Sequence, residues 1–330
     1  MKHLHLLVPD LFPPQDIAAE VCAGLQLPAL EKMLARATAT AAAPILLEDW
    51  LCNAFGASGV APVRAAADGL ATAEGYWFCA DPVSLHLQRA QVVLVPDSGL
   101  QQDEAAAMCA SLNEHFAGSG MRFFAPHPQR WYLAQQDAPR ISTTPLRTVA
   151  WQDAKLHLPQ GEGALEWQRI LTEVQMLLYA HPLNRAREAR GQPVVNSLWL
   201  WGEGRAVLLK QAFDAAGGDC GLVAAFANAA GVKVCDSLPA LLAEPGQRGL
   251  WMCAAPGDAL LRGDVFAWRE AVQQFEQECA RPLLQALQTG SLRQLVLEVP
   301  GERGSRSYTL GRGAAWALWR SARPLAGYAV

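Results

Sequence analysis

The chain has 330 residues, of which 51% are hydrophobic and 18% charged, and its formal net charge is −4. This composition is typical of a folded globular protein and excludes an intrinsically disordered chain. A weakly acidic protein has no positive field that gathers nucleic acid or anionic lipid, so neither is an expected partner. The first ten residues and the uncharged stretch 220–232 are too short for a signal peptide or a membrane span. We therefore expect a cytoplasmic protein.

Eight cysteines are scattered singly along the chain, without a CxxC pair and without a histidine at metal-ligand spacing. This pattern predicts neither a structural zinc site nor a disulfide framework. Most of the cysteines are expected to be reduced packing residues.

The first part of the chain predicts a strand followed by helices. The apolar run Leu4–Val8 indicates a buried strand, which would place Asp10 just past its end at a position typical of sites. Pro28 suits the first turn of a helix, and 45–55 predicts another helical segment. The stretch 57–74 is rich in alanine and glycine and has no clear period, so we place a domain boundary there.

After this boundary the pattern changes to short strands around a helix. Strands are predicted at 91–95 and 121–124, and the helix between them has one apolar face. This predicts a small α+β domain inserted at 73–145. Residues 1–72 and 146–330 would then form the α/β core.

The second half of the chain alternates strands and helices. An amphipathic helix is predicted from Trp167 to Leu178, ending before Pro182. Another helix runs on from Val265 and is broken or kinked at Pro282. Three apolar runs predict buried strands: 197–201, 249–253 and 294–299. Because strands alternate with helices, a mainly parallel sheet is expected.

The most distinctive segment runs from His181 to Arg205 and reads HPLNRAREARGQPVVNSLWLWGEGR. It resembles the HPxNxxRxxxGxxxxNxxWxWGxG segment of archaeal-type cofactor-independent phosphoglycerate mutases, which belong to the alkaline-phosphatase superfamily. About ten fixed positions agree in order, whereas the GxG alone would be a weak signal. The resemblance implies an alkaline-phosphatase-like α/β fold, with a mainly parallel sheet flanked by helices and a smaller α+β domain inserted.

Weaker similarity extends over nearly the whole chain. Residues 103–113 and 123–130 resemble the family's EExxxLxxxLN helix and its arginine-bearing segment. Residues 255–264 are similar to its APDExGHxGD element, and 295–302 lie where its closing strand and Asp-His pair would be. The overall pattern is most similar to that of degenerate bacterial proteins known as phosphoglycerate-mutase-like or RpfE-type regulatory proteins.

The departures from the family concern its chemistry. Mutases of this kind use two divalent metal ions, held by Asp and His ligands, and a serine nucleophile. The positions that match these ligands are Gly257, Leu261, Gly301 and Glu302. No histidine follows His181, and no counterpart of the nucleophile segment occurs between Phe12 and Leu30. The resemblance therefore implies a protein that has lost the two-metal site, and we expect no cofactor.

The acidic residues that remain are Asp10, Asp258, Asp264, Glu276 and Glu302. Asp10, Asp258 and Glu302 are the metal candidates, because carboxylate oxygens suit Mg²⁺ or Mn²⁺. The expected alternative is that these carboxylates are solvated at loop and helix ends.

Five residues are candidates for binding an anion: Arg130, Asn184, Arg187, Asn196 and Arg205. Their amide and guanidinium donors suit a phosphorylated or carboxylated small molecule. Arg130 matches the position of an arginine that the family uses near its substrate. The alternative is that the motif's Asn and Arg side chains cap helix and loop ends while Trp199 and Trp201 pack the sheet.

Three functions remain open. The first is a degenerate phosphoglycerate-mutase-like protein that acts as a sensor or regulator. The second is an active mutase, or a related phosphotransferase, whose Mn²⁺ or Mg²⁺ ligands are rearranged. The third is an interaction module that docks a protein partner through an exposed apolar patch with Trp316 and Trp319, for which core packing is the expected alternative.

Overall fold

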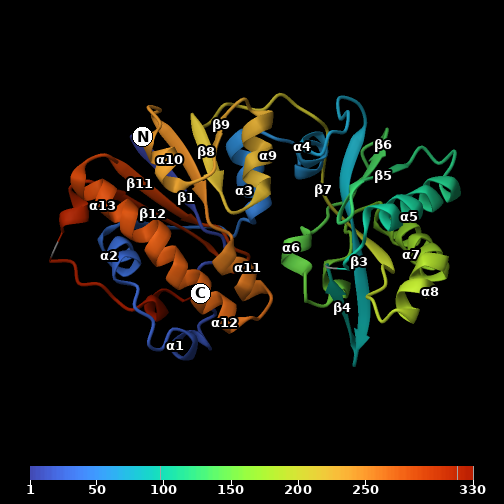
Figure 1. Cartoon of the computed structure of the whole chain (residues 1–330), viewed down its shortest axis with the longest axis horizontal. Helices are drawn as coiled ribbons and strands as arrows, with labels where there is room; N and C mark the ends of the chain where they lie inside the picture. Colours follow the sequence, from blue (N-terminus) through green and yellow to red (C-terminus); the bar gives the residue numbers. More distant parts are fainter. Residues whose placement is uncertain (97, 318, 330) are drawn as a thin grey trace. The chain divides into compact units, whose positions relative to one another are not determined.

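The protein, described by a computed structural model at residues 1–96, 98–317 and 319–329, folds into two compact units (Figure 1). Met1–Phe55 and Leu209–Val330 form one of them, here called the parallel unit. Gly56–Leu208 forms the other, the insert unit. The insert unit therefore begins before and ends after the predicted boundaries 73–145.

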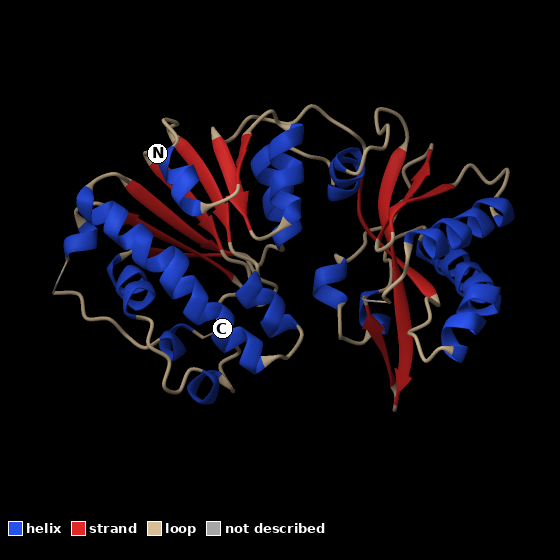
Figure 2. Cartoon of the chain, viewed as in Figure 1, coloured by secondary structure: helices blue, strands red, loops and turns tan. Residues whose placement is uncertain are grey.

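A β-sheet, drawn in red in Figure 2, forms the centre of the parallel unit. It has seven strands, in the order β2-β12-β11-β1-β10-β8-β9. The strands are β1 (His3–Leu7), β2 (Thr38–Ala42), β8 (Ala215–Gly218), β9 (Lys233–Cys235), β10 (Arg248–Met252), β11 (Gln294–Val299) and β12 (Ser305–Gly311). The pairings from β11 to β9 are parallel, and β12 is antiparallel to both of its neighbours. The predicted mainly parallel sheet is confirmed.

Side chains alternate along each strand, so the sheet has two apolar faces that must be buried. Helices cover both of these faces. The helices are α1 (Ala18–Val21), α2 (Pro28–Arg36), α3 (Leu47–Phe55), α9 (Gly221–Ala229), α10 (Leu238–Ala243), α11 (Ala255–Leu261), α12 (Val265–Phe275) and α13 (Arg281–Thr289). Leu4 of β1 lies in a core shared with α2, α12 and α13. His5 points to the other face and contacts Phe213. The ring of Phe213 touches Phe55 of α3, which in turn touches Phe226 of α9.

The insert unit contains an antiparallel sheet with β3 at its centre. Its strands are β3 (Tyr76–Gln88), β4 (Gln91–Val95), β5 (Arg122–His127), β6 (Arg130–Gln135) and β7 (Ser197–Gly204). The run at 197–201 is a buried strand as predicted, but it does not join the parallel sheet. It is part of β7, which pairs antiparallel with β3 from Trp77 to Val83. This pairing explains why the insert unit extends to Leu208.

The helices of the insert unit are α4 (Val60–Ala67), α5 (Gln102–His115), α6 (Leu146–Val149), α7 (Ala164–Ala180) and α8 (Pro182–Ala189). The amphipathic helix predicted from Trp167 to Leu178 is α7. Helix α4 lies in the stretch for which no element was predicted, because its buried face consists mostly of valine and alanine and gives a weak period. None of the described helices has the length and apolar character needed to cross a bilayer.

The C-terminal segment carries two exposed aromatic side chains. Trp316 is 53% exposed and Trp319 is 81% exposed, so the expectation that both pack in the core was wrong. The segment is tied to the end of α2, where the guanidinium of Arg320 donates to the carbonyl oxygen of Arg36 at 2.9 Å. The apolar rings therefore lie on an anchored stretch of chain, facing solvent.

A single turn of π-helix at Glu276–Ala280, here called the π turn, joins α12 to α13. Pro282 therefore lies in the first turn of α13, which begins at Arg281, and does not terminate the helix. Glu276 in this turn is completely buried, and its carboxylate accepts hydrogen bonds from the amides of Ala29 and Leu30 at 3.0 and 2.9 Å. These amides belong to the first turn of α2, where a helix leaves its N–H groups unpaired. A carboxylate distant in sequence therefore caps α2.

We expect Glu276→Ala to lower the free energy of unfolding by about 2 to 4 kcal/mol, because it leaves buried amides and the partner Arg281 without an acceptor. Urea unfolding followed by circular dichroism measures this loss. Glu278→Ala, in the same turn but exposed, is the matched control and should change stability by less than about 0.5 kcal/mol. Equal losses in the two variants would contradict the capping role.

Candidate functional site

The metal candidates lie at the carboxyl edge of the parallel sheet. Asp10 follows β1 with a positive φ of 50°, and its amide donates to the carbonyl oxygen of Pro300 at 2.9 Å. A Cβ atom on Gly301 would lie 2.9 Å from Oδ1 of Asp10. The structure therefore brings Asp10 beside the segment that contains Glu302. Asp258 lies in the first turn of α11, after β10.

The side chains at this edge do not fit a two-metal centre. Across the described stretches 1–96, 98–317 and 319–329, no three His, Cys, Asp or Glu side chains are grouped so that they could hold a metal ion. Gly257, Leu261 and Gly301 offer no donor atom at the positions that match the family's ligands. Because a two-metal reaction needs ligands that hold both ions, these side chains do not support a reaction step through such a centre.

Two of the candidate anion-binding residues use their amides to join elements of the insert unit. The side-chain nitrogen of Asn184 donates to the carbonyl oxygens of Leu178 and Val195, both at 2.6 Å, and its oxygen accepts from the amide of Val195. The side chain of Asn196 accepts from the amide of Leu85 at 2.7 Å and donates to the carbonyl oxygen of the same residue at 2.9 Å. Asn196 thus replaces a peptide group where the pairing of β7 with β3 ends.

Arg187 is the most deeply buried of the five candidates, with 1% of its surface exposed. Its guanidinium forms an ion pair with Glu104 of α5 and donates to the carbonyl oxygens of Ser98 and Pro193. Arg190 adds a second, more exposed contact to Glu104 at 3.0 Å. This network joins α8 to α5 in the interior of the insert unit, and all three guanidinium nitrogens of Arg187 have protein partners.

Gly202 and Gly204 of the motif allow close packing against the start of α4. Gly202 has a positive φ of 65°, and a Cβ atom there would lie 3.0 Å from Cβ of Val60. A Cβ atom on Gly204 would come within 2.7 Å of Oγ of Ser58. Only glycine allows β7 and this segment to approach so closely.

The remaining two candidates lie at opposite ends of β6. Arg205 donates to the carbonyl oxygen of Gln136, just past the end of β6, at 2.7 Å, and lies over the ring of Tyr76. Arg130 is the first residue of β6. The structure therefore does not bring the five candidates together into one site.

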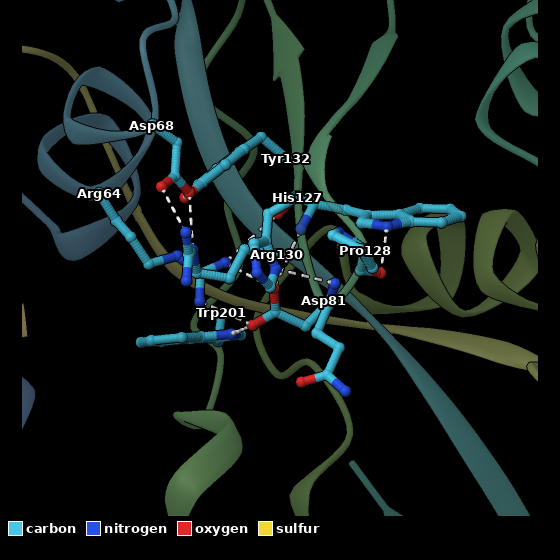
Figure 3. Close-up of polar contacts among 10 residues, drawn as sticks. Arg64, Asp68, Asp81, His127, Pro128, Arg130, Tyr132 and Trp201 are labelled. Carbon is cyan, nitrogen blue, oxygen red and sulfur yellow. Dashed lines mark hydrogen bonds and ion pairs between the residues drawn. The ribbon is translucent and has the colours of Figure 1, made fainter. Parts of the chain in front are cut away.

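Arg130 belongs instead to a cluster of charged and aromatic side chains that the sequence patterns did not reveal (Figure 3). The centre of this cluster is Asp81 of β3, which is 2% exposed. Its carboxylate accepts two hydrogen bonds from Arg64, at 2.6 and 2.9 Å. It also accepts from the indole N–H of Trp201 at 2.8 Å and from the amide of Trp131 at 3.2 Å.

Arg64 of α4 is a fixed cation in this cluster. Its guanidinium carbon lies 4.9 Å from the ring centres of both Tyr132 and Trp201, a distance at which cations are attracted to aromatic faces. Burial acts to lower the pKa of Arg64, but the charge and hydrogen bonds of Asp81 outweigh burial and raise that pKa. Arg64 therefore stays charged.

A second ion pair forms the exposed side of the cluster. Arg130 donates to both carboxylate oxygens of Asp68, at 2.8 and 2.9 Å, and the hydroxyl of Tyr132 donates to Asp68 at 2.6 Å (Figure 3). Burial raises the pKa of the Asp68 carboxyl, but these hydrogen bonds outweigh it and hold the pKa below its usual value. The side chain of Arg130 is 43% exposed, against 13% for Asp68. The cluster thus presents one guanidinium to solvent.

The cluster suits binding better than proton transfer. Two arginines and two aspartates balance in charge, and burial raises the pKa of the Tyr132 phenol, which therefore stays a neutral donor. The Arg130 guanidinium, which holds a carboxylate with two hydrogen bonds, has the donor geometry that a phosphate or carboxylate ligand requires.

The fold defines an α/β protein with a mainly parallel sheet flanked by helices and an antiparallel insert. No family model matches the chain. A solved structure of a Pyrococcus horikoshii protein superposes with a TM-score of 0.57 at 15% identity, covering 99% of this chain and 92% of that one. This likeness shows a shared fold.

Sequence comparison gives the more particular relationship. A probable 2,3-bisphosphoglycerate-independent phosphoglycerate mutase of Geobacter sulfurreducens is 30% identical over 104 residues, which are 32% of this chain and 26% of that protein. The mutase of the same name from Methanosarcina mazei is 26% identical over 156 residues, covering 45% of this chain and 38% of that protein. Over these stretches the chain is similar to phosphoglycerate mutases, the family that the motif resembles. Its matches span less than half the length of these curated relatives.

We expect Arg187→Met to lower the free energy of unfolding by about 3 kcal/mol, because the buried Glu104 would keep only the more exposed Arg190 as a charged partner. Arg185→Met, two residues away and exposed, is the matched control. Urea unfolding of both variants tests this. A stable Arg187→Met protein would show that the buried pair is dispensable.

Asp68 should make stability depend on pH in the acid range. Because its folded pKa is lowered, the stability it contributes is complete above the unfolded pKa of about 3.9 and is lost as the pH falls through the folded value. Unfolding free energies of the wild type and Asp68→Asn, measured from neutral pH down to about pH 3, should therefore converge at the acid end. The exposed Asp137→Asn is the control, and a gap that stays constant with pH would contradict the assignment.

Proposed function

We propose that this phosphoglycerate-mutase-like protein does not carry out two-metal phosphoryl transfer and acts as a regulatory or sensing protein that binds a small phosphorylated or carboxylated molecule. The observation that carries the proposal is the lack of metal-ligand side chains at the carboxyl edge of the parallel sheet. Glycine at 257 and 301 and leucine at 261 stand where the resemblance requires ligands. Asp10 alone retains its place at the end of β1.

The chemistry of phosphoryl transfer supports the same conclusion. Negative charge on the transferred group must be stabilised by metal ions or positioned cations, and little other catalysis is available to the protein. Gly257, Leu261 and Gly301 supply no side-chain ligand that could hold such metal ions. A protein of this kind retains ligand binding more readily than turnover.

Arg130 is the proposed contact for the anion. Its guanidinium is held in place by Asp68 and is nearly half exposed, so an incoming phosphate or carboxylate exchanges with a partner that already has the right geometry. Arg64 beneath it remains charged and adds a favourable field. The Tyr132 hydroxyl compensates Asp68 during the exchange.

The first test is a coupled assay for conversion of 3-phosphoglycerate to 2-phosphoglycerate with excess Mn²⁺ or Mg²⁺. We expect no turnover, because the edge lacks ligands for two ions. Turnover that is abolished both by a chelator and by Asp10→Ala would overturn the proposal. It would favour the alternative, an active mutase or related phosphotransferase whose ligands include Asp10, Asp258 or Glu302.

Binding is tested separately by calorimetry with 3-phosphoglycerate and with inorganic phosphate as probes. Arg130→Gln should weaken binding by about tenfold or more, which corresponds to about 1.4 kcal/mol for one charged contact. Arg205→Gln, at the far end of β6, is the control and should leave the affinity unchanged. Equal affinity of wild type and Arg130→Gln would remove Arg130 from the site.

A second candidate function is an interaction module without a small ligand. It is favoured by Trp316 and Trp319, which expose large apolar rings of the kind found at protein interfaces. If neither probe binds the wild-type protein, this candidate replaces the first.

A further inference from the structure

Two cysteines of the parallel unit lie in direct contact. Cys253 follows β10, and Cys279 lies in the π turn between α12 and α13. Their Sγ atoms are 3.4 Å apart and share a hydrogen bond. Both residues are buried, with 8% and 7% of their surfaces exposed, and both are free thiols.

The geometry is close to that of a bonded pair. A disulfide requires a sulfur–sulfur distance of about 2.0 Å, so the two atoms would have to approach by about 1.4 Å. Cys253 is held at the end of a central strand, where its amide donates to the carbonyl oxygen of Leu7 at 2.9 Å. Cys279 belongs to a π turn, an irregular stretch of helix that departs from the regular i→i+4 bonding. The movement that brings the two sulfurs together is therefore made mainly by Cys279.

We propose that Cys253 and Cys279 form a reversible dithiol–disulfide couple that is oxidised by hydrogen peroxide. Peroxide is small and neutral, so it suits sulfurs that are almost covered. In the first step one sulfur attacks a peroxide oxygen, the O–O bond breaks, and a sulfenic acid and one water form. The second sulfur then attacks the sulfur of the sulfenic acid, and the S–O bond breaks. The departing hydroxyl group takes the proton of the second thiol and leaves as another water. Two thiols and one peroxide thus give one disulfide and two waters.

The local environment makes this oxidation slow. The hydrogen bond with Cys279, together with burial, raises the pKa of Cys253, so little reactive thiolate is present at neutral pH. The reaction therefore responds to sustained peroxide and not to a brief exposure. The second sulfur, already in contact, favours closure of the disulfide over further oxidation of the first.

The couple would link covalently two parts of the unit that the reduced protein joins by the hydrogen bond between these thiols and by core packing. The same π turn carries Glu276, whose carboxylate caps α2. A disulfide between Cys253 and Cys279 would fix this turn to the end of β10. The proposal concerns the parallel unit and does not depend on anion binding at Arg130.

The test is to expose the folded full-length protein to peroxide and then count free thiols after denaturation. We expect the count to fall from eight to six and to return to eight after dithiothreitol. Mass spectrometry of the non-reduced digest should show one linked pair, joining the peptides of Cys253 and Cys279. The midpoint of urea unfolding should rise in the oxidised protein and fall back on reduction.

Two variants make the assignment specific. Cys279→Ser should abolish the linked peptide, whereas Cys235→Ser, which removes another buried cysteine of the same unit, should leave it intact. If Cys279→Ser does not fold, the linked peptide of the wild type still decides the question. A count that stays at eight, a loss of thiols without the linked peptide, or a link to another cysteine would overturn the proposal.

Discussion

A carboxylate inside a β-sheet destabilises the fold by several kcal/mol unless hydrogen-bond donors surround it. Asp81 meets this condition through donors from three elements, namely Arg64 of α4, Trp131 of β6 and Trp201 of β7. The requirement therefore fixes where α4 and β7 lie against β3. It also keeps Arg64 charged beneath Tyr132, and so determines the surroundings in which Arg130 faces solvent.

The two units differ in the side chains that they could contribute to catalysis or binding. The parallel unit has the sheet edge at which Asp10 lies, but glycine and leucine stand at positions where the resemblance implies metal ligands. The insert unit retains the distinctive motif, whose Asn184, Arg187 and Asn196 bond to the protein itself. Similarity in that motif thus reports the shared architecture of the insert more directly than a shared reaction.

Much of the fold could be predicted from sequence, because β1, α7 and β4 have strong local patterns. The location of β7 could not, since a short apolar run does not specify which sheet buries it. Helix α4 was missed because small side chains give little periodicity. The Asp81 cluster had one usable signal, a charged residue followed by proline within the apolar run 76–83, which implies a buried partner. That the partner is Arg64 follows only from the tertiary pairing of α4 with β3.

The π turn also sets the rotational phase of the long helical segment from Val265 to Thr289. Each residue of an α-helix advances by about 100°, so one additional residue in a wide turn rotates everything beyond it by that amount. Counted with this offset, Leu283 and Leu287 of α13 return to the face occupied by Trp268 of α12, and all three are fully buried. Counted as a continuous α-helix, Leu287 would lie about a quarter-turn away. The segment therefore has two hydrophobic stripes that are continuous in space only because the turn shifts one against the other.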